Sequence, residues 1–126
     1  MPRLNRIQII GYLGKDPDTR YLPTGKPVTN FTVAVNEDYQ RDGETVEQTE
    51  WFNVEAWNGI GLNAAQYLRR GSQVYVEGRL RTRDYTDREG VERTWVYILA
   101  RDIQYLGKPA DNQTESSEPN DIDIPF

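Results

Sequence analysis

The chain has 126 residues and a formal net charge of −5, with no cysteine and no histidine. A chain of this length suits one domain with a real core. Without cysteine there is no disulfide or thiolate chemistry, and without histidine the commonest metal ligand and general base is missing. Most enzyme templates are therefore excluded, and we expect a binding protein without a cofactor.

The charge is divided unevenly along the chain. Residues 1–108 hold all 15 Lys and Arg and 15 of the 20 Asp and Glu, whereas residues 109–126 hold five acids and no base. A body that is neutral overall can still bind phosphate if its basic side chains gather on one face. The sequence has no run of about 18 apolar residues. Residues 1–17 also lack the apolar segment and cleavage site of a signal peptide, so we expect a soluble intracellular protein.

The first half of the chain predicts three strands, at residues 5–14, 28–36 and 48–57. Apolar residues alternate with polar ones in all three, and the predicted inward-facing residues are Ile7, Ile9, Phe31, Val33, Val35, Phe52, Val54 and Ala56. Gly11 marks a bulge in the first strand. Residues 15–27 form a connection rich in Pro, Gly and Asp, and residues 37–49 form a long polar hairpin with an Asp42-Gly43 turn.

The second half predicts a single helix followed by two strands. Asn58 caps the helix and Gly71 ends it. The apolar helix positions, which follow helical spacing, are Ile60, Ala64, Tyr67 and Leu68. The strands lie at residues 73–83 and 95–100, separated by a Glu89-Gly90 turn. The residues predicted to face inward or to close the domain are Val74, Val76, Leu80, Ile103, Tyr105 and Leu106.

Three strands, one helix and two strands in this order match the five-stranded oligonucleotide/oligosaccharide-binding barrel (OB-fold), whose helix lies between strands three and four. We therefore predict an all-β barrel with long hairpin loops. An all-β sandwich is the alternative, but it explains the single helix poorly.

The third predicted strand has an unusual outer face. Alternation places Trp51, Asn53, Glu55 and Trp57 together, and because an unpaired carboxylate is costly to bury, this face is expected to stay in water. The two indoles would lie roughly 20 Å apart. Exposed aromatic rings suit a flat, apolar partner such as a nucleic-acid base. The same pattern also fits a second protein layer that covers both rings, and this strand alone leaves the two readings open.

The fourth predicted strand adds positive charge. Arg79, Arg81 and Arg83 share one face and have aromatic residues near each end. Such a row can track the phosphates of a single strand, although a solvated strand face is the alternative. Trp95 opens an apolar strand, so a core or interface role is expected for it.

The C-terminal region changes in composition. From Pro109 onward it is rich in Asn, Gln, Ser, Glu and Pro, and it cannot bury enough surface to order itself. We predict a disordered linker at 109–120. The chain then ends in alternating acidic and apolar residues, typical of a linear motif that docks onto a partner protein: Asp121, Ile122, Asp123, Ile124, Pro125 and Phe126.

Together these segments resemble the bacterial single-stranded DNA-binding proteins. The resemblance covers essentially the whole chain in order, through NRIQIIGYLGKDPDTRY, TGKPVTNFTVAV, QTEWFNVEAW, YLRRGSQVYVEGRLRTRDYTDREG and DIDIPF. It implies sequence-tolerant binding and protection of single-stranded DNA in replication, recombination and repair by residues 1–108. It also implies a homotetramer, a nucleoid-associated cytoplasmic location, and a tip at 121–126 that recruits partner enzymes.

The resemblance also assigns site residues. The base-stacking positions it implies are Tyr39, Trp51, Trp57 and Tyr85, with tyrosine at both loop sites where better-known members have tryptophan. The phosphate-contacting positions it implies are Arg70, Arg79, Arg81 and Arg83. The chain departs from the family pattern at Gly59 and Asp84, where better-known members have lysine, and at Ile122, which interrupts an acidic run.

Two other functions compete with DNA binding. Small barrels host metal-dependent nucleases, and carboxylates occur in the predicted loops at Asp16, Asp18, Glu37, Asp38 and Asp42, but nothing fixes them on one face. A pure adaptor, in which the barrel only oligomerises and the tail recruits partners, does not explain the exposed tryptophans.

Overall fold

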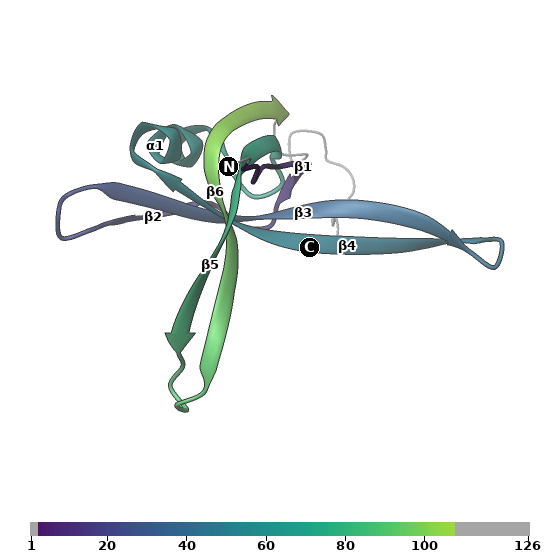
Figure 1. Cartoon of the computed structure of the whole chain (residues 1–126). Helices are drawn as coiled ribbons and strands as arrows, with labels where there is room; N and C mark the ends of the chain where they lie inside the picture. The colour runs from purple at the N-terminus through teal and green to yellow at the C-terminus, as the bar shows by residue number, and fades with distance from the viewer. Residues whose placement is uncertain (1–2, 108–126) are drawn as a thin grey trace.

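The computed structural model describes residues 3–107, and Figure 1 shows how the elements are arranged. In chain order these residues form β1 (Ile7–Leu13), β2 (Asp18–Tyr21), β3 (Pro27–Arg41), β4 (Glu44–Trp57), α1 (Asn58–Tyr67), β5 (Gln73–Thr86) and β6 (Glu92–Gly107). The predicted linker at 109–120 and tip at 121–126 lie outside the described residues. Within residues 3–107, no helix has the length and apolarity needed to cross a membrane.

The strands form one sheet in the order β1-β5-β6-β4-β3-β2. β1 pairs with β5 along most of its length and also with β3, through Tyr12 and Leu13. These two pairings bring the sheet back to its first strand, so five strands make a closed circuit and β2 extends it at β3. Residues 3–107 are thus mainly β with one helix, as predicted.

The interior of this circuit is apolar. Its buried residues come from all five strands of the circuit, from α1 and from the residue that follows α1: Ile9, Leu13, Phe31, Val33, Val54, Ala56, Ala64, Leu68, Val74, Val76, Ile98 and Ala100. Ile7, Val35, Phe52 and Ile103 are partly buried against this core. The inward-facing residues predicted for the first three strands are therefore confirmed.

Three other predicted core residues are exposed. Leu80 is 43% exposed because the pairing of β1 with β5 ends at Gly78, which leaves that side of β5 without a neighbouring strand. Tyr105 and Leu106 are also exposed, and the ring of Tyr105 packs against that of Tyr67, with 5.5 Å between the ring centroids.

Figure 1 shows three hairpins that leave the circuit in different directions: β2–β3, β3–β4 and β5–β6. The predicted polar hairpin at 37–49 is mostly strand, because β3 and β4 stay paired to Arg41 and Glu44 and leave Asp42 and Gly43 as the turn. Both turn residues have positive φ, as this kind of tight hairpin requires. The connection predicted at 15–27 contains β2, whose short, exposed sequence carries no apolar alternation.

The helix differs from its prediction at both ends. Asn58 is its first residue, with φ of 54°, and the preceding Trp57 occupies the N-cap position without a side-chain hydrogen bond. The helix ends at Tyr67, where the Leu68 N–H donates to the Ala64 carbonyl, and Gly71 lies in the turn that follows.

Glycines allow two close backbone approaches. Gly11 is regularly paired with Val74, so the predicted bulge is absent there; instead, a Cβ at Gly11 would collide with the carbonyl oxygen of Ala34 on β3. A Cβ at Gly78 would collide in the same way with the carbonyl oxygen of Leu99 on β6. Gly11 thus permits β1 to meet β3, where the circuit closes.

The β5–β6 pairing shifts register at Glu77/Gly78. Glu77 lies opposite Asp102 and Gly78 opposite Ala100, so Arg101 is the extra residue on β6. An extra residue in one strand changes which of its side chains point to a given face of the sheet. Just before the bulge, an odd-numbered residue of β5 lies opposite an even-numbered residue of β6, and after it odd lies opposite odd. Beyond this bulge, odd-numbered residues of β6 share a face with the arginines of β5.

Candidate nucleic-acid interface

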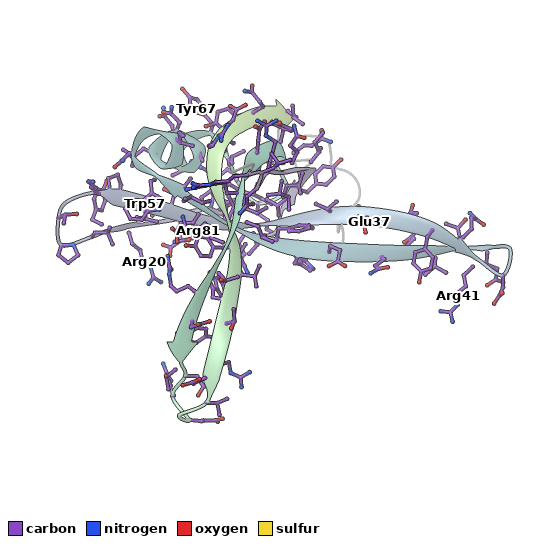
Figure 2. All side chains as sticks on the ribbon, in the orientation of Figure 1. Arg20, Glu37, Arg41, Trp57, Tyr67 and Arg81 are labelled. Atoms are coloured by element: carbon purple, nitrogen blue, oxygen red, sulfur yellow. The ribbon has the colours of Figure 1, made fainter. Side chains whose placement is uncertain are left out.

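The strand register assembles one outer face from β4, β5 and β6. Glu55 on β4 is level with Leu99 on β6, which pairs with Arg79 on β5. Side-chain alternation extends this face along each strand. We call it the arginine–tryptophan face and define it by Trp51, Trp57, Arg79, Arg81, Arg83, Tyr85 and Trp95. Figure 2 shows Trp57 and Arg81 near the place where the hairpins leave the circuit, with Tyr67, the last residue of α1, apart from them at the top of the view.

Three aromatic rings of this face are open to solvent. Trp51 is 46% exposed, Tyr85 44% and Trp95 41%. Trp57 is half-buried. Trp51 lies over Gly14, where an added Cβ would come within 2.6 Å of the indole. The Cζ3 and Cη2 atoms of the Trp51 ring therefore lie close against the backbone at Gly14.

Glu55 is 5% exposed, so the expectation that its carboxylate stays in water is wrong. Its Oε2 accepts a hydrogen bond from Trp57 Nε1 at 2.8 Å, and its Oε1 pairs with Arg83 at 3.3 Å. Arg83 also donates to the Tyr97 hydroxyl at 3.2 Å and lies 4.9 Å from the centre of the Tyr97 ring. Burial is tolerated because both carboxylate oxygens have partners.

The predicted phosphate-contacting arginines fall into three situations. Arg79 and Arg81 are exposed and have no ion pair within residues 3–107, whereas Arg83 is paired with Glu55. Arg70 lies in the turn after α1, away from this row, and its backbone N–H donates to Asp16 at 2.8 Å. The structure brings three of the four together.

Tyr39 is separated from the other predicted stacking residues. It lies opposite Val46 on the β3–β4 arm, while Ala34, five residues earlier on β3, lies opposite Trp51. Residues an odd number apart on a strand point to opposite faces. Tyr39 is 42% exposed but belongs to the other face of the arm.

Two residues of this region were not predicted as part of a site. Arg20 on β2 is level with Val28 on β3, which is level with Trp57, and the Arg20 side chain is 79% exposed. No strand was expected there, so no register could place it. Trp95 was expected in a core or interface, but the β6 bulge turns it onto the arginine–tryptophan face opposite Arg83.

The positions that depart from the family pattern also have defined places. Asp84 points to the opposite face of β5 from the arginines and accepts a hydrogen bond from Thr94 at 3.0 Å. Gly59 is exposed near the start of α1 with open space around it. Among residues 3–107, no three acidic side chains come together in a way that could hold a metal ion.

Asp87 organises the tip of the β5–β6 arm. Its Oδ1 accepts from the N–H groups of Glu89 and Val91, each at 2.9 Å, and its Oδ2 accepts from Arg93 at 2.7 Å. The hydrogen bond from Arg93, followed by that from the Val91 backbone, lowers the pKa of Asp87.

A carboxyl whose pKa is lowered by folding stabilises the fold above its unfolded pKa and loses that contribution as pH falls through its folded pKa. We therefore expect the arm tip to loosen on acidification below the usual range of an aspartate. An NMR pH titration should show the Val91 amide shifting in that window in the parent and not in Asp87→Asn. An unchanged titration in the variant would contradict this role.

Comparison with known proteins gives a consistent result. The family model described as the single-strand binding protein family matches residues 4–106. The chain is 43% identical over 110 residues to a single-stranded DNA-binding protein of Neisseria meningitidis serogroup B, covering 86% of this chain. It is 43% identical over 114 residues to single-stranded DNA-binding protein 1 of Xylella fastidiosa, covering 89% of this chain and 84% of the relative. The chain spans 63% of the length of the Neisseria relative.

A solved structure is also similar. It is described as the Plasmodium falciparum SSB complex with ssDNA, and it matches with a TM-score of 0.78 and 30% sequence identity, over 84% of this chain and 97% of that one. The likeness therefore includes both the arrangement of elements and the sequence.

Proposed function

Because the chain belongs to the single-strand binding protein family, we propose that it binds and protects single-stranded DNA without sequence preference. The observation that carries the proposal is the arginine–tryptophan face on three adjacent strands, where exposed aromatic rings lie beside Arg79 and Arg81, which have no ion pair among residues 3–107. Such a surface offers flat faces to bases and positive charge to phosphates. The protein has no catalytic role in this proposal.

In the proposed mechanism, bases stack on Trp51, Trp57 and Tyr85, while Arg79 and Arg81 follow the phosphates. Every base has a π-face, so stacking is tolerant of sequence. Arg70, Arg83 and Tyr39 complete the set assigned by the family resemblance. Tyr39 lies on the opposite face of the β3–β4 arm. For a base to stack on Tyr39, the bound DNA would have to pass around the edge of this arm.

Fluorescence titration tests this function. Tryptophan emission should be quenched by oligo(dT) and not by duplex DNA of equal length. The logarithm of the affinity should fall with the logarithm of the salt concentration, with a slope of about −0.7 for each phosphate contacted. Equal binding of both DNAs, or no binding of oligo(dT), would refute the proposal.

We also assign the closed circuit of β1, β5, β6, β4 and β3 to an OB-fold barrel in a DNA-binding domain at residues 1–108. Its support is that β1 is paired on both sides near Leu13. For the homotetramer, the support is that residues 7–11 of β1 pair with β5 only within the described chain, and that Ile10 is 53% exposed. Light scattering that gives a monomer mass would contradict this assembly.

The C-terminal proposal rests on sequence alone. Residues 109–120 would be a linker, and the tip at 121–126 would dock onto replication, recombination and repair proteins in the cytoplasm at the nucleoid. Apolar residues alternating with acids suit such a peptide motif. The five acids of 109–126 would also compete weakly with DNA for the arginines of the body.

Deleting residues 109–126 is expected to strengthen oligo(dT) binding, most visibly at low salt, where screening is least. It is also expected to abolish recruitment of the partner proteins. Replacing Ile124 and Phe126 with Ser is the matched control, because it keeps every acid and should impair recruitment alone. If the deletion changes neither property, the region has neither role.

A further inference from the structure

The arginine–tryptophan face contains one buried acid. Glu55 lies on β4 between the two tryptophan positions, and its side chain is only 7% exposed. A carboxylate at this place opposes binding of an anionic strand, and its burial requires partners. Its position on a proposed DNA-binding face therefore needs a physical explanation.

Both oxygens of this carboxylate are engaged, and by different strands. Oε2 accepts from Trp57 Nε1 at 2.8 Å, and Oε1 faces Arg83 at 3.3 Å. A hydrogen bond to the indole N–H fixes the rotation of the ring as well as its position. Glu55 thus links the orientation of an aromatic ring on β4 to an arginine on β5.

The charges within the pair offset each other. Arg83 has its guanidinium against Glu55 and the Tyr97 hydroxyl, whereas Arg79 and Arg81 have no acidic partner among residues 3–107. A cation already balanced at 3.3 Å attracts a phosphate less than an unpaired one does. The three arginines of the row are therefore not electrostatically equivalent.

Resting on the proposed function, we infer that Glu55 is a positioning residue of the DNA-binding face. Its carboxylate holds the Trp57 indole in a fixed orientation for stacking and cancels most of the charge of Arg83. Arg79 and Arg81 then carry the phosphate attraction, and Arg83 serves mainly to permit the burial of Glu55. The Trp57 ring is thereby fixed for stacking, whereas Arg83 does not contribute a full phosphate contact.

Charge-neutral variants test this division of labour. The salt slope of oligo(dT) binding is measured for the parent, Arg81→Gln, Arg83→Gln, Glu55→Gln and the double variant Glu55→Gln/Arg83→Gln. Arg81→Gln should make the slope shallower by about 0.7, the value for one phosphate, and Arg83→Gln by clearly less. Glu55→Gln should make the slope steeper by about 0.7 because it frees Arg83. Adding Arg83→Gln to Glu55→Gln should restore the parent slope.

A second measurement reports on the ring directly. In the free protein, Glu55→Gln should shift the NMR resonance of the Trp57 indole N–H, because a neutral acceptor replaces a carboxylate, while Arg81→Gln should leave it in place. Arg83→Gln leaves a buried charge without its partner, so it is the variant at risk of unfolding. Neither Glu55→Gln nor the double variant has that defect. If Arg83→Gln does not fold, the difference in salt slope between these two variants shows whether Arg83 contacts a phosphate once Glu55 is neutral.

The inference is overturned if Glu55→Gln leaves both the salt slope and the indole resonance of Trp57 unchanged. It is also overturned if Arg83→Gln folds and flattens the slope as much as Arg81→Gln does. Failure of the proposed function looks different, because the parent would then bind no oligo(dT). In that case the indole shift alone still decides whether Glu55 holds Trp57.

Discussion

Replacing Trp51 or Trp57 with Ala is expected to weaken oligo(dT) binding by about 1–3 kcal/mol each, or roughly 5- to 150-fold. The reason is that each ring would stack on at least one base and alanine offers no flat surface. Trp51 lies against the backbone at Gly14, and Trp57 donates a hydrogen bond to Glu55, so each ring has a defined contact in the free protein. Fluorescence anisotropy of a labelled oligo(dT) measures the loss without relying on the tryptophans themselves.

Tyr67→Ala is the matched control for these variants. Tyr67 is an aromatic residue that is 60% exposed, but it packs against Tyr105 and lies apart from Trp57 and Arg81. It should leave the affinity for oligo(dT) unchanged. If Trp51→Ala and Trp57→Ala bind as tightly as the parent while keeping its thermal stability, the rings belong to a protein contact instead.

Gly78→Ala is expected to lower the free energy of unfolding by about 1–3 kcal/mol and to impair DNA binding at the same time. The added methyl group would collide with the backbone carbonyl of Leu99, and a backbone atom cannot turn aside as a side chain can. β5 and β6 would have to separate where the β5–β6 arm begins. The arginines that follow on β5 would then be displaced from the tryptophans of β4.

Gly59→Ala is the control for this glycine. No atom lies within 4 Å of a Cβ built there, and Gly59 is in the first turn of α1. Because alanine favours a helix over glycine by roughly 0.5–1 kcal/mol, this variant should be as stable as the parent or slightly more stable. Urea unfolding of both variants makes the comparison, and equal stabilities would show that the Leu99 contact is unimportant.

The core of this protein could be predicted because it obeys a simple alternation. In its strands, a buried apolar residue is followed or preceded directly by a polar one, as at Phe31, Val33, Val54 and Val76. Because successive side chains of a pleated strand point to opposite faces, every second side chain is buried. The hairpin turn at Asp42-Gly43 was equally predictable, because few other pairs adopt positive φ at both positions.

Other features depend on tertiary structure and could not be predicted. β2 has no apolar alternation, since it only extends the edge of β3. Leu80 follows the alternation, but the pairing of β1 with β5 ends at Gly78, so β1 no longer flanks β5 at Leu80. In both cases the local pattern of apolar and polar residues is read correctly. What the sequence does not give is which other strand or side chain packs against that segment.

The site shows the same limit. That Trp51, Trp57 and the arginine row each line one face followed from spacing, but spacing within single strands does not say that the faces coincide. The β4–β6 register and the extra residue Arg101 decide that. The burial of Glu55 was missed for a related reason, because its partner Arg83 is 28 residues away in sequence.

Photocrosslinking gives the most direct test of whether DNA lies on the arginine–tryptophan face. The full chain is irradiated in complex with oligo(dT), and the crosslinked residues are identified by mass spectrometry. Adducts are expected at Trp51, Trp57, Tyr85 and Trp95, and not at the exposed pair Tyr67 and Tyr105. Adducts at Tyr67 and Tyr105, with none on the arginine–tryptophan face, would show that the DNA binds elsewhere on the protein and would contradict the proposed binding face.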